Sequence, residues 1–301
     1  MNRRVGAHVS ASGGLEKAIE RAHAIGANCA QIFSGSPRVW KRTELQTIQT
    51  EKMFAKRKEL NVEPIFTHSL YLVNLASENP ELLRKSFDVL QYDLRFDSLI
   101  KGSGIVVHLG SHQGRGFDAV KEQVAQQIAK LLETTPEDST FLIENSAGQN
   151  GKLCSDLSEI SWLTDRVDEL LSSSSHEESG SIPAIARLGW CLDTCHAHAA
   201  GYSLGESQGS LISKSAINEI TKLGLWDSLK CIHVNDSKDS FDSGRDRHEN
   251  LGEGNISKED MEFFLNYGTV NKITLITEAP GFEGNGPDAP NIEYLRKLSH
   301  A

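Results

Sequence analysis

Nine histidine and acidic side chains of this 301-residue chain stand where metal ligands are expected. Six of them end, or nearly end, short apolar runs of the sequence: His68, His108, Glu144, Asp193, His233 and Glu278. Imidazole and carboxylate groups together are donors that Zn²⁺ or Mn²⁺ accepts, and crowded carboxylates without a cation would repel one another. One histidine at the end of a strand is more often a hydrogen-bonded core residue. Six such residues at the ends of different runs argue against that interpretation.

Three further residues join this set through short local spacing. His196 follows Asp193 by three residues, and Asp246 and His248 lie in the sequence Asp-Arg-His. A two-residue separation in an extended loop places both side chains on the same side of the chain. The resulting five histidines and four carboxylates are too many for one tetrahedral zinc ion. They suit two or three ions that share a bridging carboxylate.

The elements that must position these residues are eight short runs of apolar or β-branched residues. Most runs are continuous rather than alternating, as expected for strands buried on both faces. They cover residues 3–9, 27–33, 62–68, 104–110, 140–145, 186–193, 229–236 and 272–278. Helical spacing lies between them, for example Leu83, Phe87, Leu90 and Leu94. The alternation predicts an α/β fold, a (β/α)₈ TIM barrel with the metal site at its C-terminal mouth. A doubly wound open sheet is the structural alternative.

We expect a single domain over residues 1–301. The stretch 172–183 is polar and rich in serine. It is interpreted as a solvated surface loop, inserted between the fifth helix and the sixth strand, rather than as a linker between domains.

Composition excludes membrane, secreted, fibrous and disordered classes. No stretch approaches the roughly 18–20 apolar residues that span a bilayer, and the N-terminus lacks the apolar region of a secretion signal. Five cysteines without a C-x-x-C pair predict reduced thiols in an intracellular, cytoplasmic protein. The P-loop pattern is absent from the sequence, and Cys195 is interpreted as a passive thiol.

Several longer strings resemble the endonuclease IV family of zinc-dependent apurinic/apyrimidinic endonucleases. The most specific are DTCHAHAAGY (193–202) and DRHENLGEGNI (246–256), whereas GAHVS (6–10) alone would be weak. The resemblance covers almost the whole chain, from Gly6 to the last helical stretch near Leu298. The other matching strings are HSLYLVNLAS (68–77), HLGSH (108–112), IENSAGQ (143–149), HVNDSK (233–238) and TEAP (277–280).

This resemblance implies a trinuclear zinc site in a (β/α)₈ barrel, with Mn²⁺ as a possible occupant of some positions. One zinc ion would be held by His68, His108 and Glu144. The second would be held by Glu144, Asp193, His233 and Glu278, so that Glu144 bridges the pair and is the catalytic carboxylate. The third would be held by His196, Asp246 and His248.

The resemblance also implies a DNA-repair activity. The family cleaves duplex DNA on the 5′ side of abasic sites and leaves a 3′-hydroxyl and a 5′-deoxyribose phosphate. A metal-bridging hydroxide would attack the phosphorus, because coordination lowers the pKa of water from about 15.7 to near 7. Arg38, Tyr71 and Leu72 match the positions that the family inserts into the minor groove. Trimming of blocked 3′ ends is left open.

Net charge stands in tension with this DNA-binding role. The chain carries a formal charge of −10, whereas proteins that bind DNA usually present a basic surface. We expect a local basic cluster at the mouth and a monomer, since a neighbour would block duplex DNA. The basic residues near the ligand loops are Arg38, Lys41, Arg42, Arg115, Arg245 and Arg247.

Two other functions compete with the nuclease. A metal-dependent sugar isomerase or epimerase of the same barrel type would also gather acidic and histidine residues at strand ends. It needs one or two metals, so His196, Asp246 and His248 would have no role. A non-catalytic zinc- or DNA-binding protein would bind abasic DNA without cutting it, and it would be expected to lack some ligand.

Overall fold

Eight parallel strands close into a barrel in the computed structural model, which describes residues 3–174, 183–205 and 214–301. Around the barrel the strands follow the order β1-β12-β9-β6-β5-β4-β3-β2. Their bounds are β1 (Val5–His8), β2 (Cys29–Phe33), β3 (Ile65–His68), β4 (Ile105–Val107), β5 (Phe141–Glu144), β6 (Leu188–Asp193), β9 (Leu229–His233) and β12 (Thr274–Thr277). The predicted TIM barrel is confirmed, and the doubly wound open sheet is wrong because β1 pairs with both β2 and β12.

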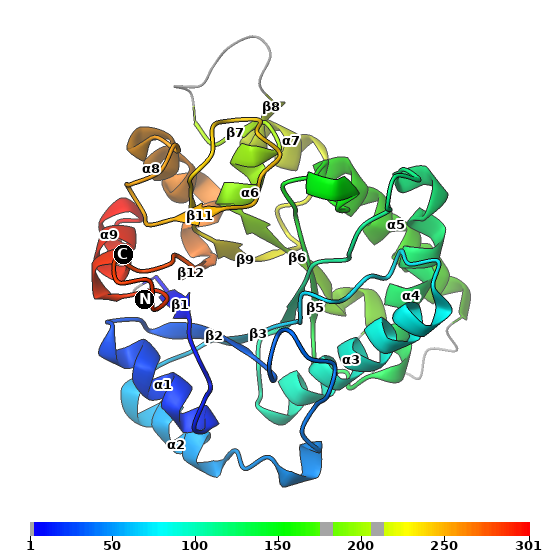
Figure 1. Ribbon diagram of the computed structural model, residues 1–301, viewed down its shortest axis with the longest axis horizontal. Coiled ribbons are helices and arrows are strands. Elements are labelled where there is room, and N and C mark those ends of the chain that lie inside the picture. The colour runs from blue at the N-terminus through cyan, green and yellow to red at the C-terminus, as the bar shows by residue number, and fades with distance from the viewer. Residues whose placement is uncertain (1–2, 175–182, 206–213) are drawn as a thin grey trace.

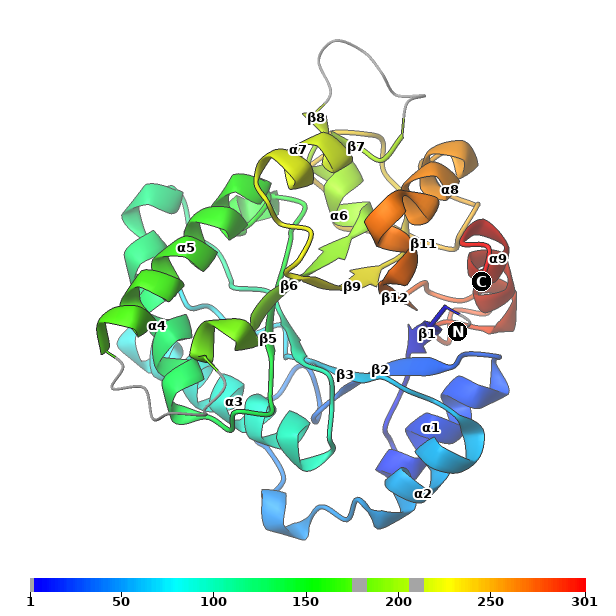
Figure 2. The same cartoon turned by 180° about the vertical axis from the view of Figure 1, so that it is seen from behind.

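Helices surround this barrel as a ring in both views (Figures 1 and 2). The α-helices are α1 (Leu15–Ala24), α2 (Glu51–Leu60), α3 (Pro80–Leu99), α4 (Lys121–Thr134), α5 (Leu157–Ser174), α6 (Thr194–Ala199), α7 (Ala216–Lys222), α8 (Lys258–Asn266) and α9 (Ala289–Leu298). Short 3₁₀ helices are η1 (Leu45–Thr47), η2 (Phe117–Ala119), η3 (Gln149–Gly151), η4 (Ala184–Arg187) and η5 (Gly268–Lys272). β1 and α9, the first and last elements of the described residues, lie side by side (Figures 1 and 2).

Among the described residues, two pairs of very short strands lie outside the barrel. β10 (Asp236–Ser237) pairs antiparallel with β11 (His248–Glu249), and β7 (Tyr202–Ser203) pairs with β8 (Lys214–Ser215). The predicted strand at 229–236 is too long, because the barrel strand ends at His233. The chain then turns into β10, whose pairing holds the segment that carries His248.

A layer of apolar side chains lies inside the barrel, whose interior is a packed core in this fold. Each member comes from a different strand and is fully or almost fully buried. The layer consists of Cys29, Phe66, Val106, Leu142, Cys191, Cys231 and Ile276. All five cysteines of the chain are buried free thiols, in agreement with the expectation of reduced cysteines.

Strand register sets the height of the polar residues above this layer. The pairing of β6 with β9 shifts at Trp190 and Cys191, so that Cys191 faces Cys231 and Asp193 faces His233. Such a bulge re-aims the residues that follow it. Here it brings a carboxylate and an imidazole from neighbouring strands to the same level.

Local sequence signals fix the helices that brace the barrel. The Asn79 side chain accepts hydrogen bonds from the N–H groups of Glu81 and Leu82 at the start of α3, and Pro80 occupies the first turn. Ser257 accepts from the Asp260 N–H at the start of α8, at the position where the sequence suggests a capping box.

The predicted surface loop at 172–183 begins too early. Residues 172–174 continue α5, and Pro183 directly precedes η4; the intervening part of that prediction lies outside the described residues. Within the described ranges, we find no helix with both the length and the apolar character needed to cross a membrane.

Candidate metal centre

The nine predicted ligands meet at the carboxyl ends of the barrel strands, in three adjoining clusters. Within each cluster, the candidate ligand atoms all lie within 4.8 Å of one another. The clusters are His68, His108 and Glu144; Glu144, Asp193, His233 and Glu278; and His196, Asp246 and His248. These are the groupings that the family resemblance implies, with Glu144 common to the first two.

Glu144, at the end of β5, directs its two carboxylate oxygens to different neighbours. Oε2 lies 3.1 Å from His108 Nε2 and 3.3 Å from His68 Nε2. Oε1 lies 2.9 Å from His233 Nδ1. The carboxylate therefore stands between two clusters with one oxygen facing each, as a bridging ligand would.

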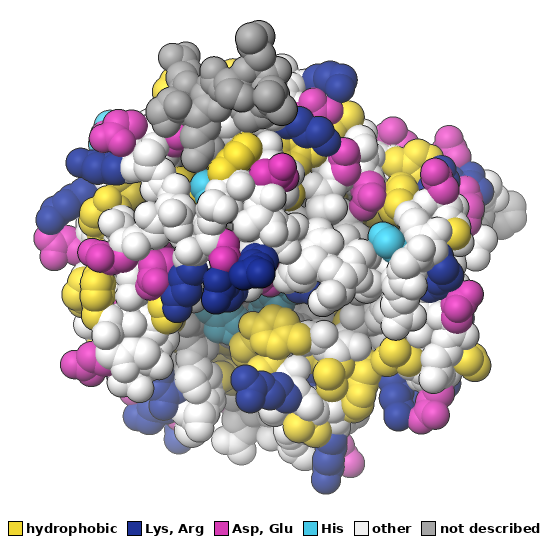
Figure 3. All heavy atoms as spheres, turned by 45° about the horizontal axis from the view of Figure 1, so that its top comes forward, with side chains coloured by type: hydrophobic (Ala, Val, Ile, Leu, Met, Phe, Trp, Pro, Cys, Tyr) yellow, Lys and Arg dark blue, Asp and Glu magenta, His cyan; other side chains and the backbone are white. Residues whose placement is uncertain are grey.

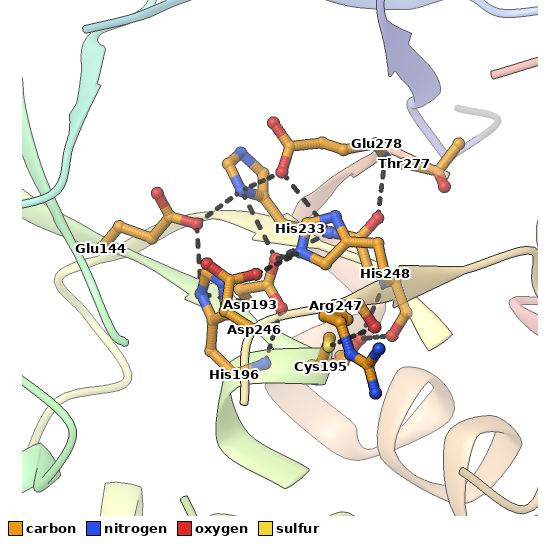
Figure 4. Close-up of polar contacts among 12 residues, drawn as sticks. Glu144, Asp193, Cys195, His196, His233, Asp246, Arg247, His248, Thr277 and Glu278 are labelled. Atoms are coloured by element: carbon orange, nitrogen blue, oxygen red, sulfur yellow. Dashed lines mark hydrogen bonds and ion pairs between the residues drawn. The ribbon is translucent and has the colours of Figure 1, made fainter. Parts of the chain in front are cut away.

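Asp246 plays a comparable part in the third cluster. Its Oδ1 lies 3.0 Å from His196 Nε2 and 3.4 Å from His248 Nε2 (Figure 4). Its Oδ2 faces away from the histidines, 3.3 Å from Gln149 Nε2 and 3.4 Å from Lys152 Nζ. The second oxygen is thus held by the η3 loop, which leaves the first for the cluster.

Asp193 ends β6 and also begins α6. Its Oδ1 accepts a hydrogen bond of 2.9 Å from the His196 N–H, as an N-cap residue does. Its Oδ2 accepts one of 2.7 Å from Asn235 Nδ2 and faces His248 Nε2 at 3.6 Å. The same residue therefore turns the chain into α6 and places His196 beside the other ligands.

Two buried asparagines hold these ligands in place, and neither was predicted from the sequence. Asn145 Oδ1 accepts from the Asp193 N–H at 2.6 Å, and the Asn145 carbonyl oxygen lies 3.0 Å from His196 Nδ1. Asn235 Oδ1 accepts from the Glu278 N–H at 2.7 Å. Both asparagines directly follow or closely follow a predicted ligand in the strings IENSAGQ and HVNDSK, which was the available signal.

Burial and close charges shift the pKa values of this site strongly. Burial lowers the pKa of His108 to about 3. Burial alone would also lower the pKa of His196, but the carboxylates of Asp193 and Asp246 outweigh it and raise the value to about 10. Burial would raise the pKa of Glu144, and the imidazoles of His108 and His233 instead hold it well below its usual range. Carboxylates and protonated imidazoles thus lie close together in a buried site. A bound cation would displace the protons that these imidazoles carry.

The donor atoms fit zinc or manganese. His68 Nδ1 lies 2.6 Å from the Ser69 carbonyl oxygen and His196 Nδ1 lies near the Asn145 carbonyl, so the Nε2 atom of each ring faces the cluster. The His248 Nε2 atom is buried and makes no hydrogen bond. Burial raises the pKa of the nearby Cys191 and Cys195 thiols, which keeps them protonated and leaves nitrogen and oxygen as the donors.

Apolar and basic side chains border the centre. Histidine side chains are visible at the bottom of a hollow, with Lys and Arg along one rim and hydrophobic side chains along the other (Figure 3). The Tyr71 ring lies 5.6 Å from the His68 ring, and Tyr71 and Leu72 are 58% and 38% exposed. Arg38 is exposed on the loop after β2. The three residues assigned to DNA contact therefore lie on the surface, and Tyr71 directly adjoins the candidate ligand His68.

The predicted basic cluster is only partly available at this mouth. Arg42 turns inward, where its Nε lies 3.8 Å from the buried Asp93 carboxylate. Arg247 is paired with Asp239, and Arg115 with Glu78 at 3.3 Å. These pairings leave no local signal in the sequence, because each acidic partner lies eight or more residues away from its arginine.

The fold and site together define a TIM barrel of the xylose isomerase-like type, whose family profile matches residues 19–298. A D-tagatose 3-epimerase-like protein shares this fold, with a TM-score of 0.65, 16% identity and coverage of 99% of this chain and 98% of that chain.

Relatives with higher sequence identity identify the family within this fold type. The chain is 34% identical over 294 residues to "Probable endonuclease 4" of Halothermothrix orenii, covering 98% of this chain and 99% of the relative. It matches the crystal structure of endonuclease IV from Thermus thermophilus with a TM-score of 0.80, 30% identity and 99% coverage of both chains. The chain belongs to the endonuclease IV family.

Proposed function

We propose that this protein is a DNA-repair endonuclease that hydrolyses the phosphodiester bond 5′ to abasic sites in duplex DNA. The products are a 3′-hydroxyl and a 5′-deoxyribose phosphate. One observation carries the proposal: three adjoining histidine–carboxylate clusters, two of them sharing Glu144, stand at the mouth of a barrel that belongs to the endonuclease IV family.

The clusters would hold three zinc ions, and Mn²⁺ could replace zinc at some positions because its preferences for nitrogen and oxygen ligands overlap. Bound zinc would supply a water of lowered pKa and positive charge for the phosphate oxygens. Glu144 would hold the paired site together through its two oxygens, whereas Asp246 would complete the separate third site.

The protein's own residues would then fix the geometry of the reaction. Asn145 and Asn235 orient Asp193 through hydrogen bonds to its backbone and its carboxylate. The Ser69 carbonyl fixes the ring of His68. Held in this way, the ligands cannot turn toward one another when the scissile phosphate enters, so little reorganisation accompanies the reaction.

DNA would be gripped from the rim of the mouth. Tyr71, next to His68, and the adjoining residue Leu72 present exposed apolar surface suited to entering a base step of the minor groove. Arg38 offers a cation on the neighbouring loop for the phosphate backbone. An abasic nucleotide has little stacking to lose, so its extrusion toward the metal centre costs less than that of an intact nucleotide.

The sugar epimerase alternative accounts for the barrel but not for the full site. An epimerase of this type needs one or two metals, and the cluster of His196, Asp246 and His248 would then have no role. The likeness to the epimerase-like structure at 16% identity concerns the fold alone. The third cluster is therefore the feature that favours phosphodiester hydrolysis.

Cleavage of a duplex with one tetrahydrofuran residue tests the proposal. This abasic analogue cannot undergo β-elimination, so incision reports hydrolysis. We expect one cut on its 5′ side that leaves a 3′ end a polymerase can extend, and no cut in the matching intact duplex. Stable binding without incision would favour the non-catalytic protein, and epimerisation of a ketose without incision would favour the sugar enzyme. A duplex ending in a 3′-phosphoglycolate tests trimming of blocked ends.

A further inference from the structure

We propose that Gln31 is a positioning residue of the paired metal site, one that selects which atoms of His233 and Glu278 face the metals. The inference rests on the proposed metal centre. Gln31 lies in β2, is fully buried, and has no predicted role in the sequence motifs. Its side chain lies within hydrogen-bond distance of two candidate ligands and of His8.

The contacts of the Gln31 amide define its orientation. Nε2 lies 2.8 Å from Glu278 Oε1 and 3.0 Å from His8 Nδ1, and Oε1 lies 2.8 Å from His233 Nε2. An ionised carboxylate can only accept hydrogen bonds, so the NH₂ end of the amide must face Glu278. The carbonyl end then faces His233.

This orientation fixes the tautomer of His233. Because the Gln31 Oε1 atom can only accept, His233 Nε2 must carry the hydrogen. The lone pair is left on Nδ1, which lies 2.9 Å from Glu144 Oε1 and 3.3 Å from Glu278 Oε2. His233 thereby presents its free nitrogen to the cluster, which is the form a metal requires.

The Gln31 amide also gives the two carboxylate oxygens of Glu278 different surroundings. Oε1 is occupied by Gln31 Nε2 and lies 3.0 Å from His8 Nδ1. Oε2 is left facing His233 Nδ1, and therefore the paired site. One neutral side chain on β2 thus orients two ligands, His233 at the end of β9 and Glu278 directly after β12. Neutrality matters, because a carboxylate here would repel Glu278 and a cation here would repel the bound metal ions.

Substitution of Gln31 by methionine tests the proposal, since methionine has similar length but cannot make these hydrogen bonds. Zinc affinity is measured by competition with a chromophoric chelator on the full chain. We expect Gln31→Met to weaken binding of at least one zinc ion about 10–100-fold, the usual effect of losing a residue that orients a ligand. Asn266→Leu is the matched control, because Asn266 donates to the carbonyls of Glu262 and Leu298, outside the metal clusters.

Unchanged zinc affinity in folded Gln31→Met protein would overturn the proposal. Should that variant not fold, ring ¹⁵N spectra of the zinc-loaded wild type decide: a hydrogen on His233 Nε2 supports the proposal, and one on Nδ1 contradicts it. Neither readout uses DNA. If the protein binds zinc as described but does not cut abasic duplex, the proposed function is refuted. The role of Gln31 is still decided by zinc affinity and by the His233 tautomer.

Discussion

Individual residues at this centre serve two neighbours at once. Glu144 turns one oxygen toward His68 and His108 and the other toward His233. Asp246 offers one oxygen to His196 and His248 and has the other held by the η3 loop. A carboxylate that bridges two metal sites sets the distance between them. An imidazole instead offers one nitrogen to a metal and uses the other for a hydrogen bond that orients the ring.

Replacement of Glu144 by glutamine tests its bridging role. Glutamine keeps the shape but offers only one oxygen, so one of the two clusters loses a ligand. We expect cleavage of abasic duplex to fall at least about 100-fold, with less zinc retained at the paired site. Single-turnover rates and elemental analysis measure the two effects. Near-normal turnover with full zinc content would refute the bridging assignment.

Replacement of Asp246 by alanine should cost the third zinc ion selectively. Asp246 contacts only the histidines of its own cluster among the candidate ligands, so the paired site should keep both ions. Lys152→Met is the matched control, because it removes the neighbour of Asp246 Oδ2 and no ligand. Elemental analysis should give two ions for the first variant and three for the second. Loss of all ions from the Asp246 variant would break the division into separate sites.

Residue types explain which parts of the centre could be predicted. Histidine and acidic residues at the ends of apolar runs are informative, and all nine that were selected lie in the clusters. Gln31, Asn145 and Asn235 carry no such signal, since amides are common in loops and strands. Their roles follow from which backbone and side-chain atoms they meet, which only the folded chain shows.

At the scale of elements, the loop that follows β11 is held by hydrogen bonds to one buried carboxylate. The Asp236 carboxylate, in β10, accepts hydrogen bonds from four backbone N–H groups: those of Ser237, Gly252, Gly254 and Ile256. It thereby fixes the loop that follows β11, the strand containing His248. The eight barrel strands could be predicted from the sequence, whereas β10, β11 and the register shift between β6 and β9 could not. Two-residue pairings and register shifts depend on tertiary contacts and leave no periodic pattern.

Helix α3 carries a buried carboxyl group that makes stability depend on pH. Burial raises the pKa of Asp97 to about 7, with Thr67 Oγ1 donating to it at 3.1 Å. The folded protein therefore holds this proton more tightly than the unfolded chain, whose aspartates titrate near pH 3.9. Stability should fall as pH rises from about 4 to about 7.

The variant Asp97→Asn isolates this effect, because asparagine cannot ionise. Relative to the wild type, it should gain on the order of 3 kcal/mol in unfolding free energy between about pH 5 and about pH 8. Urea denaturation of both proteins at the two pH values measures the difference, and titration of the metal centre cancels in the comparison. A constant difference at the two pH values would show that Asp97 does not titrate in this window.

At the scale of the whole molecule, the negative charge must be reconciled with DNA binding. The formal charge is −10, and three Zn²⁺ ions, at +6 in total, would bring it to −4. Several arginines near the mouth are already paired with acidic residues. Few cations therefore remain to contact phosphates, and Arg38, exposed on the loop after β2, becomes important among them.

The salt dependence of cleavage tests whether Arg38 contacts a DNA phosphate. We expect KM for abasic duplex to rise with salt concentration while kcat changes little. Arg38→Ala should lower the slope of log KM against log salt by about one, as loss of one phosphate contact does. Arg166→Ala is the control, because that arginine pairs with Glu122 and Glu169 on the helical ring. An unchanged slope, or loss of zinc from the Arg38 variant, would show that its role is structural.

The most direct test of the account is incision of the tetrahydrofuran duplex while zinc is returned stepwise to metal-free protein. We predict no incision without metal and full incision only when the third equivalent has bound. Incision by the metal-free protein, or a plateau after one or two equivalents, would contradict the trinuclear centre. Absence of incision from protein confirmed to hold three zinc ions would contradict the proposed activity itself.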